Sequence, residues 1–466
     1  YGSEAEVREL VDGFRSRGLP LSAVHLDIDY MDGHRVFTVD PKRFPDLAAL
    51  GRECDGKGVK LVAILDPGVK EDESLPLYRE GVEKGLFCEL PDGRKLRGPV
   101  WPGACAFPDF TKPATRAWWA AQYPRLLEQG ISGAWHDMNE PSVFGAWGEA
   151  TLPLSTRHDL DGRGGDHREA HNLYALLEAR AGYEGMAAHR PGQRPWILSR
   201  SGWVGLQRYA WNWTGDSESS AASLRQSVRI ALSMGLSGIP YTGPDIGGFG
   251  GAPSATLFTR WFQCASFLPF FRTHSAFFTP RREPWSFDDA TLAVAKDFLH
   301  LRYRLMPYWY TLAWQASRTG APLVRPMWWD RPGDSMLLGA DDQFLAGDAF
   351  LVAPILDEEG GLRNLVLPPG RWYSMWQEGV FVDGPAIGQV EPVPGKIPVL
   401  VRAGSVVPMD EGGRFVLHAW APAGGDGGGL LYDDAGDGAG LLSLFDQYYQ
   451  RRADGNSARR FAHYLG

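Results

Sequence analysis

Short apolar runs that end in polar residues recur along the first two thirds of the chain, and amphipathic patterns separate them. The chain opens on one such pattern, because Val7, Leu10, Val11 and Phe14 fall on one helical face after a capping Ser3. The apolar runs predict seven strands, at 23–30, 60–66, 133–138, 195–200, 209–216, 238–245 and 270–274. Helices are predicted between them at 47–58, 115–129, 167–180, 221–234, 256–267 and 291–317. Strands that alternate with helices indicate a parallel sheet with right-handed crossovers.

Polar residues at the carboxyl end of nearly every strand are typical of a (β/α)₈ TIM barrel, which we expect over residues 1–320. Since the chain opens on a helix and shows seven strands, the first barrel strand is expected upstream of Tyr1. Two connections, near 69–112 and 141–166, are too long for simple loops. Such insertions at this end of a barrel usually wall an active site.

The pattern changes after Gly320, where short strand-like runs are separated by Gly and Pro. It predicts a proximal β-sandwich at 321–402 and a small distal β-domain at 403–466. The expected fold class is therefore α/β, with a TIM barrel followed by C-terminal β-sandwich domains.

Composition narrows the classes of partner. The net charge of −9 argues against nucleic acid and anionic membranes, which need a basic surface. No stretch approaches the roughly 20 apolar residues of a membrane span. Four cysteines without a C-x-x-C pair form no disulfide framework and favour a cytoplasmic location. The 18 Trp suit the apolar faces of sugar rings, although large cores also use tryptophan.

Two carboxyl groups at strand ends are the minimum for cleaving a glycosidic bond, one ionised and one protonated. Asp137 and Asp216 each follow an apolar strand, and Asp27 and Asp245 occupy equivalent strand ends. Four acids near one barrel mouth repel each other, so at least one pKa should be raised. An aromatic, poorly hydrated setting favours Asp216 as the neutral acid, and a neighbouring arginine such as Arg200 favours an ionised nucleophile.

Trp135-His-Asp-Met-Asn-Glu-Pro141 resembles the nucleophile motif of glycoside hydrolase family 31, and further segments resemble other motifs of that family in the same order. The others are Leu26-Asp-Ile-Asp-Tyr-Met-Asp32, Trp101-Pro-Gly with Phe107-Pro-Asp-Phe110, Ser199-Arg-Ser, Arg208-Tyr-Ala with Trp213-Thr-Gly-Asp216, Asp245-Ile-Gly-Gly-Phe249 and Arg272-Thr-His274.

The resemblance implies a role for each matching residue. Asp137 would be the nucleophile of a retaining α-glucosidase and Asp216 its general acid/base, with carboxyls roughly 5–5.5 Å apart. Hydrogen bonds to the sugar hydroxyls would come from Asp27, Arg200, Asp245 and His274. Pocket walls would come from Trp101, Trp135, Met138, Trp213 and Phe249.

Each of these residues also has a structural interpretation. Asp27 could cap a helix, Arg200 could form a structural ion pair, His274 could be a core histidine, and Trp135 could belong to the barrel core. His167 and His171 have metal-ligand spacing, but no His-Glu-x-x-His motif is present. The sequence therefore predicts no metal and no organic cofactor.

The predicted activity is exo-acting hydrolysis of terminal non-reducing α-linked glucose from oligosaccharides, through a covalent glycosyl-enzyme. An α-xylosidase or an α-glucan lyase of the same family stays open, as does a non-catalytic sugar-binding subunit. The Asp-Met-Asn-Glu form favours glucose over xylose, and the retained acid pair favours catalysis over binding alone. The expected partner is the oligosaccharide substrate, with no nucleic acid and no membrane; a homo-oligomeric state stays open.

Overall fold

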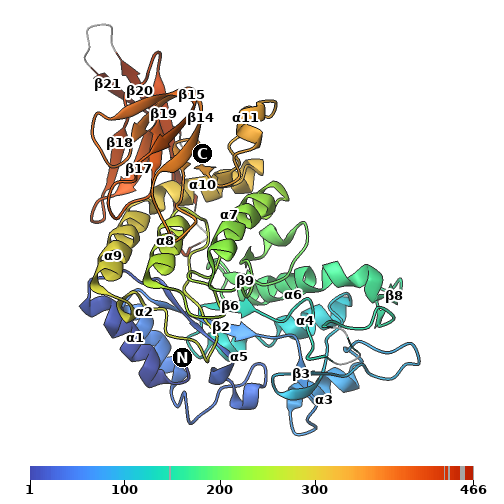
Figure 1. The fold of residues 1–466 in the computed structure, drawn as a ribbon. Coiled ribbons are helices and arrows are strands. Elements are labelled where there is room, and N and C mark those ends of the chain that lie inside the picture. The colour runs from blue at the N-terminus through green and yellow to red at the C-terminus, as the bar shows by residue number, and fades with distance from the viewer. Residues whose placement is uncertain (146–147, 149, 435, 439–440, 452–456, 465–466) are drawn as a thin grey trace. The chain divides into compact units, whose positions relative to one another are not determined.

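The structure is a computed structural model that describes residues 1–145, 148, 150–434, 436–438, 441–451 and 457–464. Parts of the predicted insertion 141–166 (146, 147 and 149) lie outside the described residues, as do parts of the predicted distal domain 403–466 (435, 439–440, 452–456 and 465–466). The chain divides into two compact units, Tyr1–Asn212 and Trp213–Gly466. Figure 1 colours the chain from blue to red along the sequence, and each unit is described by itself.

A five-stranded parallel sheet forms the centre of the first unit. Its order is β1 (Ala23–Leu26), β2 (Lys60–Leu65), β6 (Gly133–His136), β9 (Ile197–Ser199) and β10 (Trp211–Asn212). These are the first five predicted strands, and Asp27, Asp66, Asp137 and Arg200 each directly follow the last residue of one of them. After β1 the chain turns into two 3₁₀ helices, η1 (Ile28–Tyr30) and η2 (Asp32–His34).

Six α-helices accompany this sheet: α1 (Glu4–Ser16), α2 (Leu47–Gly56), α3 (Pro76–Glu83), α4 (Pro113–Ala120), α5 (Pro124–Leu127) and α6 (His167–His189). A 3₁₀ turn, η4 (Leu206–Arg208), precedes β10. The Ser3 side chain accepts from the backbone N–H of Glu6, as the sequence predicts. The single helix predicted at 115–129 is wrong, because Pro124 brings no N–H and begins a new helix.

Both predicted insertions contain short strands. The first holds a three-stranded antiparallel sheet of β3 (Val69–Lys70), β5 (Gly103–Ala106) and β4 (Gly98–Val100). The second holds the pair β7 (Arg157–His158) and β8 (Gly165–Asp166). The backbone N–H of Phe144 donates to Pro99 O at 2.9 Å, so the two insertions are hydrogen-bonded to each other.

The second unit begins with helices α7 (Ala221–Leu236), α8 (Ala255–Ala265), α9 (Asp289–Arg304), α10 (Met306–Thr319) and the short α11 (Ser335–Leu338), with a 3₁₀ turn η5 (Pro284–Ser286) before α9. The single helix predicted at 291–317 is wrong, since α9 and α10 meet at Leu305, two residues before Pro307. The strands predicted at 238–245 and 270–274 form only a single parallel bridge, Asp245 to Arg272. Pro240 and Pro244 lack the N–H groups that a ladder would need.

Antiparallel sheets complete the second unit. Six strands follow the order β11 (Val324–Arg325), β12 (Phe344–Ala346), β13 (Phe350–Val352), β16 (Val399–Arg402), β14 (Arg363–Ser374) and β15 (Phe381–Val390), around a buried core that includes Trp372. Two smaller sheets pair β17 (Val406–Asp410) with β18 (Phe415–Ala419) and β19 (Gly427–Asp434) with β20 (Leu441–Arg451) and β21 (Ser457–Tyr464). The domain limits at 320/321 and 402/403 stay predictions.

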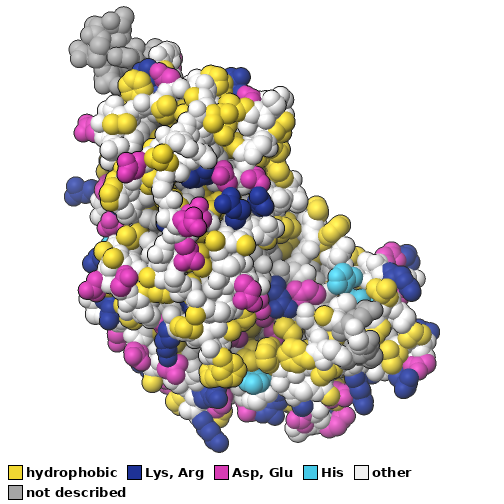
Figure 2. Space-filling model, in the orientation of Figure 1, with side chains coloured by type: hydrophobic (Ala, Val, Ile, Leu, Met, Phe, Trp, Pro, Cys, Tyr) yellow, Lys and Arg dark blue, Asp and Glu magenta, His cyan; other side chains and the backbone are white. Residues whose placement is uncertain are grey.

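The surface and the helices bear on the expected partners. On the face shown in Figure 2, basic and acidic side chains are interspersed. In the described part of the chain, no helix combines the length and the apolar character that a bilayer crossing requires. All four cysteines are buried and free.

Candidate active site

The carboxyl end of β6 holds Asp137 beside a guanidinium group. Arg200 follows β9, the next strand of the sheet, and its Nη1 lies 2.9 Å from Asp137 Oδ1. Its Nε and Nη2 donate to the two carboxylate oxygens of Glu140, each at 2.8 Å. Burial acts to raise the pKa of Glu140, but the hydrogen bonds and charge of Arg200 outweigh it and lower that pKa. The arrangement favours two ionised carboxylates on one guanidinium.

Two further buried acids accompany Asp137, and neither was singled out from the sequence. Asp66 follows β2, and burial together with the charge of Asp137 raises its pKa well above the usual range. Glu178 lies on α6, and burial raises its pKa likewise. A strand-end position was the signal that could have identified Asp66. Glu178 offered no strand-end signal, because it lies within a helix and its contact with His136 is long-range.

The side of β6 that carries the His136 ring, here called the rear of β6, is lined by polar but uncharged groups. The ring of His136 points away from the Asp137 side of the strand, since neighbouring residues alternate. Tyr123 Oη lies 2.6 Å from His136 Nε2, and Glu178 Oε2 lies 4.0 Å from His136 Nδ1. Burial lowers the pKa of His136 to about 3, so the ring is neutral at ordinary pH.

Two predicted ligands of the first unit also serve the fold. The carboxylate of Asp27 caps η1, accepting from the N–H of Ile28 at 2.7 Å. Met138 is buried with a positive φ of 55°, and its sulfur accepts from Arg200 at 3.4 Å. The capping and ion-pair interpretations of Asp27 and Arg200 are thus observed contacts, while their contacts to a sugar stay predictions.

The two predicted tryptophan walls of this unit differ in exposure. Trp135 is 2% exposed and belongs to the strand core. Trp101 is 46% exposed and meets Phe144 edge to face, with ring centroids 4.9 Å apart. Only the second tryptophan presents a ring face that a solute could reach without rearrangement.

In the second unit, Asp216 lies in the loop that follows Trp213, and its side chain is exposed. The poorly hydrated setting that the sequence predicted for this carboxyl is therefore wrong, although Trp213 itself is buried. Asp245 is fully buried and pairs with Arg272 through contacts of 2.8 and 3.1 Å. The same guanidinium lies 5.1 Å from the Trp213 ring, so it links two predicted residues.

Backbone hydrogen bonds tie the predicted residues of this unit together. Phe249 N–H donates to Ser217 O at 2.7 Å, and Ala276 N–H donates to Phe249 O at 3.0 Å. The rings of Phe249 and His274 lie 5.2 Å apart. The unit thus gathers the loops that carry Asp216, Phe249 and His274.

One buried group among the described residues has the donor set of a metal site: Cys88, Asp109 and His158. Asp109 accepts from His158 Nδ1 at 3.0 Å and also from Thr111 Oγ1 at 2.6 Å. A chain of imidazoles continues from His158 to His167 and on to His171, with nitrogens 3.0 and 3.2 Å apart. The carboxylate of Asp109 can only accept, so each imidazole in this row donates toward Asp109, and His158 and His167 each accept from the next imidazole. This is a hydrogen-bond network that joins the first insertion to α6.

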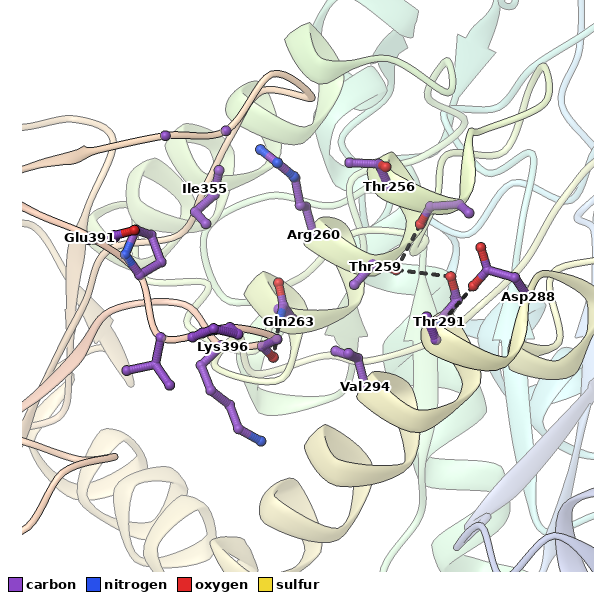
Figure 3. A pocket seen from close by; sticks show the side chains of 18 of the residues that line it. Thr256, Thr259, Arg260, Gln263, Asp288, Thr291, Val294, Ile355, Glu391 and Lys396 are labelled. Carbon is purple, nitrogen blue, oxygen red and sulfur yellow. Dashed lines mark hydrogen bonds between the residues drawn. The ribbon is translucent and has the colours of Figure 1, made fainter.

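A cavity of about 650 Å³ opens in the second unit between α8, α9 and two loops of the sandwich strands (Figure 3). Some of its polar groups pair with one another, Thr259 with Thr291 and Gln263 with Gly395 O, while Arg260 and Lys396 bond to residues outside the lining. None of the predicted site residues lines it.

The chain belongs to glycosyl hydrolase family 31. Residues 1–312 match the family's TIM-barrel domain, and residues 320–407 match its C-terminal domain. The fold class is thus confirmed as a TIM barrel followed by a β-sandwich domain.

Curated and solved relatives agree with this membership. "Alpha-glucosidase 2" of Bacillus thermoamyloliquefaciens is 38% identical over 94% of this chain and 56% of its own length. Human "Neutral alpha-glucosidase AB" is 37% identical over 93% of this chain and 47% of its own. A crystal structure of a glucosidase II alpha subunit superposes with a TM-score of 0.92 at 30% identity, covering 98% of this chain and 52% of that one. The chain therefore spans about half the length of these relatives.

Proposed function

We propose that the protein is a retaining, exo-acting α-glucosidase that releases terminal non-reducing α-linked glucose from oligosaccharides. Asp137 attacks the anomeric carbon and forms a glycosyl-enzyme. Asp216 protonates the leaving oxygen and then activates water. The names of the curated relatives support the choice of glucose. The reaction needs no metal or organic cofactor, and the free cysteines are compatible with a cytoplasmic location.

The ion pair between Asp137 and Arg200 carries this proposal. Among the three acids at the centre of the first unit, Asp66 and Glu178 are driven toward their neutral forms by burial. Asp137 alone of the three pairs with a guanidinium, at 2.9 Å. An attacking carboxylate must be ionised, and this position satisfies that requirement. Asp216 is exposed and can exchange protons with solvent.

Kinetics on p-nitrophenyl α-glucoside and α-xyloside test the proposal, with Asp137→Ala and Asp216→Ala alongside. Loss of a nucleophile costs roughly 10⁴-fold or more in kcat. Asp216→Ala should recover turnover with added azide, which attacks the glycosyl-enzyme without a general base and gives the α-glucosyl azide. Full activity in either variant, or activity abolished by a chelator, would refute the assignment. Preference for the xyloside, or an eliminated sugar product, would replace it with the xylosidase or the lyase.

A further inference from the structure

Asp66 and Asp137 each directly follow the last paired residue of their strand in the ladder of β2 with β6. Leu65 pairs with His136 in this parallel register, and Asp137 N–H donates to Leu65 O at 3.3 Å. Continuing the register by one residue sets Asp66 opposite Asp137. Neighbouring strands are about 4.8 Å apart, and paired residues of a parallel ladder point to the same face. The two carboxyls therefore share one face of the sheet as neighbours.

The two neighbours differ in their access to positive charge and water. Asp137 has Arg200 at 2.9 Å. Asp66 is 5% exposed, and its Oδ1 has no hydrogen-bond partner among the described residues. A charge on Asp66 would be desolvated and would face the charge of Asp137, so the proton belongs on Asp66.

We propose that Asp66 is a positioning residue for the reaction: it stays protonated, and its O–H donates to the carboxylate of Asp137. Arg200 then holds the nucleophile from one side and Asp66 from another. A neutral donor orients the carboxylate without neutralising it, because hydrogen bonds to a charged acceptor are strong and directional. This inference rests on the proposed function, which makes Asp137 the nucleophile.

The surroundings of Asp66 favour the protonated form. Burial contributes most to its raised pKa, followed by the charges of Asp137 and Asp27, while Arg200 acts in the opposite direction. Tyr30 packs nearby and donates its hydroxyl to Ile64 O at 3.0 Å. The titratable and charged groups whose charges interact with that of Asp66 include Asp27, Tyr30, Cys105, Asp137, Glu178 and Arg200.

Infrared difference spectroscopy tests the proton without relying on activity. The spectrum of the wild type minus that of Asp66→Asn at neutral pH should contain the C=O stretch of a protonated carboxyl. Asp12→Asn is the matched control, since Asp12 is 64% exposed and should contribute only carboxylate bands. A carboxylate band in the Asp66 difference spectrum would overturn the proposal.

Kinetics on p-nitrophenyl α-glucoside test the positioning. Asp66→Ala should lose about 10- to 100-fold in kcat, the usual worth of a hydrogen bond to a charged group. Its acidic limb of kcat/KM should move to higher pH, because the ionised nucleophile loses a donor. Asp66→Asn keeps an N–H donor and should stay within about 5-fold of wild type, with an unmoved acidic limb.

The outcomes separate the two proposals. If Asp66→Asn is as impaired as Asp66→Ala while both acidic limbs stay in place, Asp66 is only structural and the inference fails. If Asp66→Ala does not fold, the infrared band and the Asp66→Asn profile still decide. If the infrared band is present but the wild type hydrolyses neither glycoside, the proposed function fails while the proton on Asp66 stands.

Discussion

In Tyr1–Asn212 the candidate nucleophile Asp137 is held by a charged partner, Arg200. In Trp213–Gly466 Asp245 forms a buried ion pair with Arg272, but the loops that carry Asp216 and Phe249 are tied by hydrogen bonds that end on backbone oxygens. Arg200 joins Asp137 to Glu140 in the first unit. In the second, Arg282 donates to four oxygens, Gly248 O, Gly251 O, Pro280 O and Ser219 Oγ, and so fastens two loops. The difference suits the proposed chemistry. A nucleophile must keep a fixed charge, while an acid/base must gain and lose one, which an exposed carboxyl such as Asp216 can do.

Arg200→Met should break the charge-held arrangement with the largest effect. It leaves Asp137 and Glu140 without their shared cation in a half-buried setting. We expect kcat/KM on p-nitrophenyl α-glucoside to fall about 10²- to 10³-fold, which corresponds to roughly 3–4 kcal/mol. The acidic limb of the profile should move to higher pH, since the cation that favours the charged form is gone.

Arg200→Lys is the control for this change. It keeps the positive charge but loses the fork that binds Glu140 at two points, so its loss should be smaller and its acidic limb nearer that of the wild type. Equal losses in both variants would show that geometry, and not charge, holds Asp137.

Arg282→Met should disturb the second unit through folding more than through charge. Arg282 is 4% exposed, and its removal takes the donor from the carbonyl oxygen of the buried Gly248 and from three further oxygens. We expect a loss of about 2–4 kcal/mol in stability, measured as a lower thermal midpoint, with a raised KM. The acidic limb of kcat/KM should not move. Arg281→Met is the control, because that side chain is 58% exposed; equal effects in the two variants would contradict the role of Arg282.

The sequence predicted the parallel framework better than the breaks within it. The first five strands were found because β2 and β6 are continuous apolar runs, which buried parallel strands require. The sixth and seventh predicted strands do not form ladders. Pro240 and Pro244 have no backbone N–H to donate, and the apolar run that predicted the sixth strand does not register that lack. Pro124 and Pro307 were visible as helix breakers, yet the apolar period continues through both, and periodicity alone joins the pieces.

Burial was the property of the site that the sequence could not supply. Asp137 and Asp216 were singled out by equivalent positions, but Asp137 is mostly buried against Arg200 and Asp216 is exposed. Asp66 ends the second predicted strand, but its place beside Asp137 became visible only through the register of β2 with β6. Glu178 needed the packing of α6 behind His136, a long-range contact without a local pattern.

Glu178→Gln tests whether the buried acid behind β6 is neutral in the folded first unit, and the measurement is the dependence of stability on pH. The folded state holds a proton on Glu178 at pH values where the unfolded chain has lost it, because burial raises the pKa. Stability therefore falls as pH rises from the ordinary glutamate range toward the folded pKa, by at most about 1.4 kcal/mol per pH unit for one proton. The glutamine is neutral throughout, so its thermal midpoint should fall less between pH 5 and about 8.

His136 changes stability with pH in the opposite direction to Glu178, so the comparison is made between pH 5 and about 8. The pKa of His136 is about 3 in the folded state. At pH values below the ordinary histidine pKa, the unfolded chain therefore binds a proton on His136 that the folded protein does not bind. That contribution lowers stability on acidification and is common to the wild type and Glu178→Gln. Parallel curves for the two proteins from pH 5 upward would mean that Glu178 is ionised in the folded state.

Gly182→Ala should have the smallest effect, and it probes how tightly α6 supports the rear of β6. A Cβ at this position would lie 2.5 Å from Tyr123 Oη and 3.0 Å from His136 Cε1. Helix propensity favours alanine by up to about 1 kcal/mol, while overpacking costs about 1–3 kcal/mol, so a modest net destabilisation is expected. Gly56→Ala at the end of α2 is the control, since nothing lies within 4 Å of its Cβ position.

A lower thermal midpoint in Gly182→Ala alone, with kcat reduced because β6 shifts under Asp137, would show that the first unit also depends on close packing behind β6. An unchanged midpoint would show that Tyr123 and His136 can move aside to admit the extra methyl group without loss of stability.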